Sequence, residues 1–170
     1  MNAIIKKILL QFKIIQLQLQ ILILRKKLTV PNLPDPEYVV VHHEAGTANF
    51  WQVNEYHRTL WGFKSSLGYY IGYHKFIDYE GRLYIGRVDN EEAAHCAVAD
   101  KPHFWNTHSV GICLQGNFEN EQPTEAQLIT LKSELDAYKT QGRIIKTHQE
   151  IKATLCPGKN LQKWVNEYRV

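Results

Sequence analysis

Residues 38–47, YVVVHHEAGT, begin with an apolar, valine-rich run and continue into two adjacent histidines. A short apolar run of this kind is typical of a strand that is buried in the centre of a sheet. Side chains alternate between the two faces of a strand, so His42 and His43 cannot both point into one site. The stretch therefore predicts a central strand that offers one histidine for chemistry.

Further strands and helices are predicted on either side of this run. The predicted strands cover residues 73–78, 82–87, 109–116 and 143–148, the first two forming a hairpin around Glu80-Gly81. The predicted helices cover residues 51–61, 124–141 and 161–169. Thr124 and Gln127 form a capping box at the start of the second helix. The simplest assembly is an α/β fold, a mixed central sheet flanked by helices.

Residues 1–34 differ in composition from the rest of the chain. They hold six Lys and Arg and no acid, whereas the other 136 residues hold 14 basic and 17 acidic side chains, a net charge of 14 − 17 = −3. An acidic body argues against nucleic acid as a partner, because binding phosphates requires a basic surface. We expect residues 1–34 to be an N-terminal extension with a Pro-rich linker, and residues 35–170 to be one folded domain.

The extension is predicted to be an amphipathic helix with two apolar stripes, which favours self-association or contact with a membrane surface. A strand with imperfect alternation over 15–23, or an extension with no role, are the alternatives. Its longest apolar run, Ile21 to Leu24, is far shorter than the ~20 residues of a membrane span. Lys13 and the glutamines also fit poorly with a cleavable signal peptide.

Three cysteines are too few, and odd in number, for a disulfide framework. Cys156 follows His148 by eight residues and precedes Pro157-Gly158, where the backbone can turn back. A catalytic zinc site takes three protein ligands and leaves a fourth position open. His148, Cys156 and one histidine of the His42-His43 pair would complete such a set. A packed cysteine and unrelated histidines are the alternative interpretation.

Five segments of the chain match a known family in the family's own order. They are VVHHEAGT (40–47), GYHKFIDYEGRLYIGR (72–87), AAHCAV (93–98), WNTHSVGICLQGNF (105–118) and THQEIKATLCPG (147–158). Residues 38 to about 164 thus resemble the zinc-dependent N-acetylmuramoyl-L-alanine amidases of the type shared by phage endolysins and peptidoglycan recognition proteins. The resemblance implies their fold and makes residues 35–170 the amidase catalytic domain, with the first 34 residues outside it.

The resemblance also implies a metal site and an activity. Its zinc ligands would be His42, His148 and Cys156, and no ligand is missing, which argues against the non-catalytic members that lack the metal cysteine. The implied reaction is zinc-dependent hydrolysis of the amide between N-acetylmuramic acid and L-alanine in peptidoglycan, at the cell envelope or outside the cell. A peptidoglycan-binding module that does not cut, and an amidase for soluble muropeptides, are the alternatives.

Two further residues match catalytic positions of the family. Tyr73 would position the water or the carbonyl, and it is preferred over Tyr69 and Tyr70 because residues 72–87 match the family's hairpin without a gap. Thr154 would donate a hydroxyl hydrogen bond to the oxyanion.

Some residues near these motifs have two interpretations. His95 matches a family position near the substrate groove and is expected to contact substrate, the alternative being a loop histidine with no role. Glu150 is expected to hold a ligand imidazole as an acceptor, unless it is a surface carboxylate. His57 is expected to be solvated on a polar helix face. Asn106 and Ser109 are expected to organise the turn before a strand.

Overall fold

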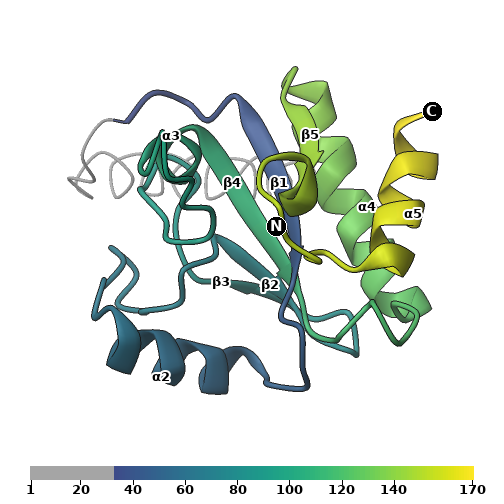
Figure 1. Ribbon diagram of the computed structural model, residues 1–170, viewed down its shortest axis with the longest axis horizontal. Coiled ribbons are helices and arrows are strands. Elements are labelled where there is room, and N and C mark those ends of the chain that lie inside the picture. Colours follow the sequence, from purple (N-terminus) through teal and green to yellow (C-terminus); the bar gives the residue numbers. More distant parts are fainter. Residues whose placement is uncertain (1–32) are drawn as a thin grey trace, which may run out of the picture. The chain divides into compact units, whose positions relative to one another are not determined.

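A computed structural model of the chain describes residues 33–170. Within them one five-stranded sheet has the order β3-β2-β4-β1-β5, and helices cover both of its faces (Figure 1). The strands are β1 (Tyr38–His43), β2 (Lys75–Ile77), β3 (Leu83–Ile85), β4 (Ser109–Leu114) and β5 (Ile144–Thr147). The helices are α2 (Phe50–Leu60), α3 (Phe104–His108), α4 (Glu125–Thr140), the 3-10 turn η1 (His148–Glu150) and α5 (Lys159–Arg169). The predicted α/β fold class is confirmed.

The predictions for residues 1–34 fall almost entirely outside the described residues. These are the amphipathic helix, its strand alternative and the start of the Pro-rich linker. Among the helices of residues 33–170, none combines the length and the hydropathy that a membrane span requires.

Strand β1 occupies the centre of the sheet, as its apolar run predicts. It pairs in parallel with β4 on one side and with β5 on the other. Only the β2–β3 hairpin at the edge is antiparallel, so the sheet is mixed. The register sets Val41 opposite Thr147 and His42 opposite Cys113, which brings the carboxyl ends of three parallel strands together at one edge.

The alternation along β1 separates two cores. Val39 and Val41 face the larger core, to which α4 and α5 contribute their apolar stripes. Cys113, the residue paired with His42, belongs to the smaller core, which is formed with Phe50 and Val53 of α2. His42 therefore lies on the α2 face of the sheet.

The helix ends follow local capping. Thr124 and Gln127 form the predicted capping box, and α4 runs from Glu125 to Thr140. Helix α2 begins one residue earlier than predicted because the Asn49 side chain caps it. The short helix α3 was not predicted, since the residues before β4 were expected to form only a turn.

The Cys156-Pro157-Gly158 turn depends on glycine at its third position. Gly158 has a φ of 87°, and a Cβ there would lie 2.4 Å from the carbonyl carbon of Phe118. The turn therefore packs backbone against backbone, and this contact holds the segment that carries Cys156.

We predict that Gly158→Ala lowers the free energy of unfolding by about 2 to 4 kcal/mol, because left-handed backbone strain adds to a steric clash. Gly142→Ala is the matched control: Gly142 has a φ of 77° but no atom within 4 Å of an added Cβ. It should lose about 1 kcal/mol, from the backbone strain alone. Urea denaturation measures both variants, and equal losses would contradict the packing argument.

Candidate metal centre

Two imidazoles and a thiol converge at the carboxyl edge of the sheet. Within the described part of the chain, His42, His148 and Cys156 form a cluster whose ligand atoms all lie within 4.8 Å of one another. His42 lies near the end of β1, and His148 follows the last residue of β5. Since Val41 and Thr147 are paired, the next residues on the two strands lie side by side. Cys156 reaches the same point from the loop before α5.

The donor atoms of the cluster point toward one another. His42 Nδ1 lies 3.6 Å from Cys156 Sγ, and the backbone N–H of His43 also donates to that sulfur at 3.4 Å. The His42 and His148 ring centroids are 4.6 Å apart. His148 Nε2 is buried and has no hydrogen-bond partner. A buried nitrogen without a partner is costly unless something binds it.

This donor set fits zinc. Zn–S and Zn–N bonds of about 2.3 and 2.1 Å, set at a tetrahedral angle, would separate the sulfur and the nitrogen by about 3.6 Å. That is the separation found between Cys156 Sγ and His42 Nδ1. Two histidines and one cysteine also leave one tetrahedral position open, as catalytic sites do.

Burial keeps all three groups uncharged. Desolvation lowers the pKa of His42 well below the ordinary value and that of His148 to about 4, so both imidazoles are neutral at pH 7. Desolvation raises the pKa of Cys156 to about 12, so without a cation the group is a thiol. A bound divalent cation reverses this preference, because the thiolate is the form that binds metal.

His43 faces away from this cluster, as strand alternation predicts. Its Nδ1 accepts a hydrogen bond from the backbone N–H of Phe118 at 3.2 Å. Of the two adjacent histidines, only His42 thus lies in the cluster with His148 and Cys156.

Tyr73 and Thr154 both lie beside the cluster. The Tyr73 ring centroid is 5.3 Å from that of His42, and burial raises the pKa of its phenol well above the usual value, so the proton stays on the oxygen. Thr154 Oγ1 accepts a hydrogen bond from Cys156 N at 3.2 Å. Tyr69 instead packs against Phe50 in the smaller core.

His95, which is expected to contact substrate, is buried against His42. It is 7% exposed, and its Nδ1 is 2.9 Å from Nε2 of His42. The ring therefore lies behind His42, on the side away from Cys156, and it contacts this candidate ligand. The sequence carries no periodic signal for this position, which lies in a loop.

Glu150 caps the turn that carries His148. Its carboxylate accepts hydrogen bonds from the backbone N–H and hydroxyl of Thr147 and from the Arg169 guanidinium. Neither His42 nor His148 is among its hydrogen-bond partners. The expected bond from Glu150 to a ligand imidazole is thus absent from this geometry, and the residue instead holds the backbone beside the ligand.

His57 was expected to be solvated, and this is wrong. It is 7% exposed, its Nδ1 accepts from the backbone N–H of Gly72, and its ring lies 5.9 Å from that of Tyr73. The spacing of Phe50, Val53 and His57 is the helical signal that could have predicted this burial, since all three lie on the face that α2 buries.

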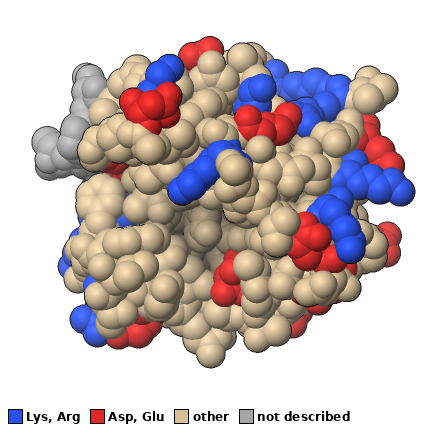
Figure 2. Space-filling view, viewed as in Figure 1, with Lys and Arg blue, Asp and Glu red and all other residues tan. Residues whose placement is uncertain are grey.

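A cavity of about 260 Å³ adjoins Tyr73. Its lining comes from the β1–α2 loop, from α2 and from Tyr73, namely Glu44, Ala48, Gln52, Val53, Tyr56, His57 and Tyr73. The surface around the hollow near the centre of Figure 2 consists mostly of uncharged residues. Such a surface suits an amide- and hydroxyl-rich ligand better than a polyanion.

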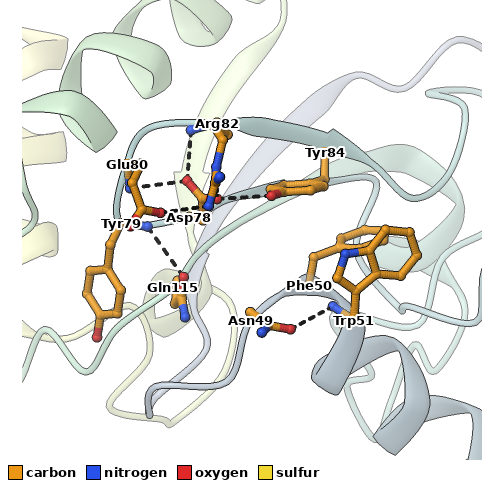
Figure 3. A pocket seen from close by; sticks show the side chains of 9 residues that line it. All are labelled: Asn49, Phe50, Trp51, Asp78, Tyr79, Glu80, Arg82, Tyr84 and Gln115. Atoms are coloured by element: carbon orange, nitrogen blue, oxygen red, sulfur yellow. Dashed lines mark hydrogen bonds and ion pairs between the residues drawn. The ribbon is translucent and has the colours of Figure 1, made fainter.

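A larger cavity, of about 380 Å³, lies between the β2–β3 hairpin and the start of α2 (Figure 3). Its buried polar groups are committed to the fold: Asp78 accepts hydrogen bonds from Arg82 and Tyr84, and the Gln115 amide donates to the backbone. None of the three candidate ligands lines it. We therefore place the chemistry at the His42 cluster.

Comparison with known proteins finds related sequences and a related fold over most of the chain. The sequence profile of the N-acetylmuramoyl-L-alanine amidase family matches residues 32–159. Peptidoglycan-recognition protein SC1a of Drosophila melanogaster is 32% identical over 147 residues, covering 78% of this chain and 71% of that protein. The solved N-acetylmuramoyl-L-alanine amidase LysC of Clostridium intestinale is 26% identical with a TM-score of 0.65, over 80% of this chain and 87% of that one.

We predict that Zn²⁺ binding at about pH 6, below the pKa of about 7 of a zinc-bound water, releases about one proton, because Cys156 must become a thiolate while both imidazoles are already neutral. Affinity should therefore rise about tenfold per pH unit from above the pKa of His148, about 4, up to about pH 7, where a zinc-bound water begins to lose a proton as well. Calorimetry in buffers of different ionisation enthalpy counts the protons. Cys156→Ser should bind more weakly and release none; release of two protons, or of none by the unaltered protein, would contradict the assignment.

Proposed function

Because this chain belongs to the N-acetylmuramoyl-L-alanine amidase family, we propose that it is a zinc-dependent hydrolase of the amide between N-acetylmuramic acid and L-alanine in peptidoglycan. The observation that carries the proposal is the complete donor set of His42, His148 and Cys156. The 3.6 Å between His42 Nδ1 and Cys156 Sγ matches one edge of a tetrahedral zinc site, and a set of three ligands leaves the fourth position for water or substrate. A pure binding module needs no such set.

The residues beside the donor set have the properties that amide hydrolysis requires. Zn²⁺, when bound, lowers the pKa of a water molecule to about 7 and polarises a scissile carbonyl. Tyr73 keeps its phenolic proton and can orient the amide by donating a hydrogen bond to it. The Thr154 hydroxyl accepts from Cys156 N, so its own proton remains available to the oxyanion.

The substrate and the place of action follow from the same proposal. Several relatives carry the name peptidoglycan-recognition protein, which supports peptidoglycan as the ligand. The enzyme would then act at the cell envelope or outside the cell, as a phage lytic enzyme or a bacterial wall enzyme. Soluble muropeptides are the alternative substrate, and comparison of intact sacculi with anhydro-muropeptides decides between them.

The second candidate function is recognition without cutting. It is favoured by the names of the same relatives, which describe recognition rather than hydrolysis. It predicts binding to peptidoglycan whether or not zinc is present. Turnover that depends on the donor set would exclude it.

We predict that the zinc-loaded protein releases stem peptides from purified sacculi and that a chelator stops the release. Thr154→Val should lower kcat about 100-fold because the oxyanion donor is lost; it also removes the acceptor of the Cys156 N–H, so the zinc content of the variant is measured alongside. Cys156→Ser should lose both zinc and turnover. His103→Ala, at a surface histidine whose side chain is 79% exposed, is the control and should match the unaltered protein. Intact sacculi in the presence of stoichiometric zinc would refute the proposal.

We propose that residues 1–34 mediate self-association or contact with an anionic membrane surface. Their charge of +6, without any acidic residue, supports contact with an anionic membrane. Their apolar residues support both membrane contact and self-association. Deletion of the segment should lower the sedimentation coefficient beyond the change in mass, or abolish binding to anionic vesicles. A deletion variant that behaves like the full chain in both assays would remove this role.

A further inference from the structure

A chain of hydrogen bonds runs from His42 into the protein, away from Cys156. His42 Nε2 lies 2.9 Å from His95 Nδ1, and His95 Nε2 lies 3.3 Å from Ser109 Oγ. Ser109 Oγ in turn donates to the backbone carbonyl of Trp105 at 2.5 Å. His42, His95 and Ser109 are all buried. The chain links the candidate ligand to a backbone oxygen that lies in α3.

The carbonyl at the far end sets the direction of every bond in this chain. A carbonyl oxygen can only accept, so the single hydroxyl proton of Ser109 is directed to Trp105. Ser109 Oγ can then only accept from His95, which places the proton of His95 on Nε2. A neutral imidazole has one N–H, so His95 Nδ1 accepts and His42 Nε2 donates. The lone pair of His42 is left on Nδ1, the atom that faces Cys156.

The reversed arrangement is unfavourable on the same grounds. With the proton of His95 on Nδ1, its Nε2 lone pair would face a Ser109 oxygen whose proton is already bonded to Trp105. Two buried acceptors would then face each other at 3.3 Å, with no proton between them. The proton of His42 would at the same time sit on the atom that should bind the metal.

The surrounding backbone holds His95 in place for this role. Asn106 Oδ1 accepts hydrogen bonds from the backbone N–H groups of His95 and Cys96, at 3.0 and 2.8 Å. Gly111 of β4 lies under the ring, where a Cβ would come within 2.6 Å of His95 Cγ. The His95 imidazole thus packs directly against the backbone of Gly111 and cannot rotate without breaking these contacts.

We propose that His95 is a positioning residue, aligned by Ser109 and the Trp105 carbonyl, that holds His42 in the Nε2–H tautomer and so presents Nδ1 to the metal. This role goes beyond the proposed hydrolysis, because the tautomer of His42 and the zinc affinity can both be measured without turnover. An inactive protein would therefore leave it fully testable.

The direct test is the tautomer itself. Long-range ¹⁵N–¹H NMR spectra of the full chain distinguish Nδ1–H from Nε2–H imidazoles. We expect Nε2–H for both His42 and His95. In Ser109→Ala the loss of the aligning oxygen should give His95 a mixed tautomer population. Observation of Nδ1–H for either histidine in the unaltered protein would overturn the proposal.

Zinc affinity, measured by competition with a chromophoric chelator, supplies the second readout. His95→Phe fills the space without accepting a proton and should weaken zinc binding about 10- to 100-fold. His95→Gln can accept the same proton through its amide oxygen and should recover most of the affinity, which a merely space-filling role would not predict. His103→Ala is the control. If His95→Phe folds and binds zinc like the unaltered protein, His95 does not position His42. If His95→Phe fails to fold, the zinc affinity of His95→Gln relative to the unaltered protein and the NMR tautomer test decide.

Discussion

The parallel pairing of β1 with β5 is the constraint on which the rest of the site depends. With Val41 opposite Thr147, the chain leaves both strands at the same edge and delivers two imidazoles side by side. A slip of one residue would exchange the faces of His42 and His43. His43 would then meet Cys156, and its bond to Phe118 N would be lost. The register of one strand pair thereby selects the histidine that a metal can reach.

Much of this could be predicted from the sequence because the relevant signals are local. The apolar run of β1, the alternation of its two histidines and the Thr124–Gln127 capping box each depend on neighbouring residues alone. The convergence of His42, His148 and Cys156 is not local, and spacing left it undecided between a site and a packed cysteine. The resemblance of five segments to one family supplied that assignment, and the structure places the three side chains together.

The remaining features depend on contacts between segments distant in the chain. His95 stands behind His42 only because β4 offers Gly111 at the position where any Cβ would displace the ring. Glu150 also binds Arg169, a partner that α5 brings from 19 residues further along the chain. The helical spacing of α2 can predict that His57 is buried, but not that its ring accepts a hydrogen bond from Gly72, which lies in a loop without periodicity. A pattern within one segment of the sequence cannot predict these contacts with distant segments.

The central claim is that two nitrogens and one sulfur of this chain hold a single zinc ion with one position open. X-ray absorption at the zinc edge of the loaded protein tests it most directly. The account predicts one sulfur at about 2.3 Å, two imidazole nitrogens at about 2.0 to 2.1 Å and one further light atom that exogenous ligands replace. A spectrum without sulfur, or one with a fourth protein ligand that closes the site, would contradict it.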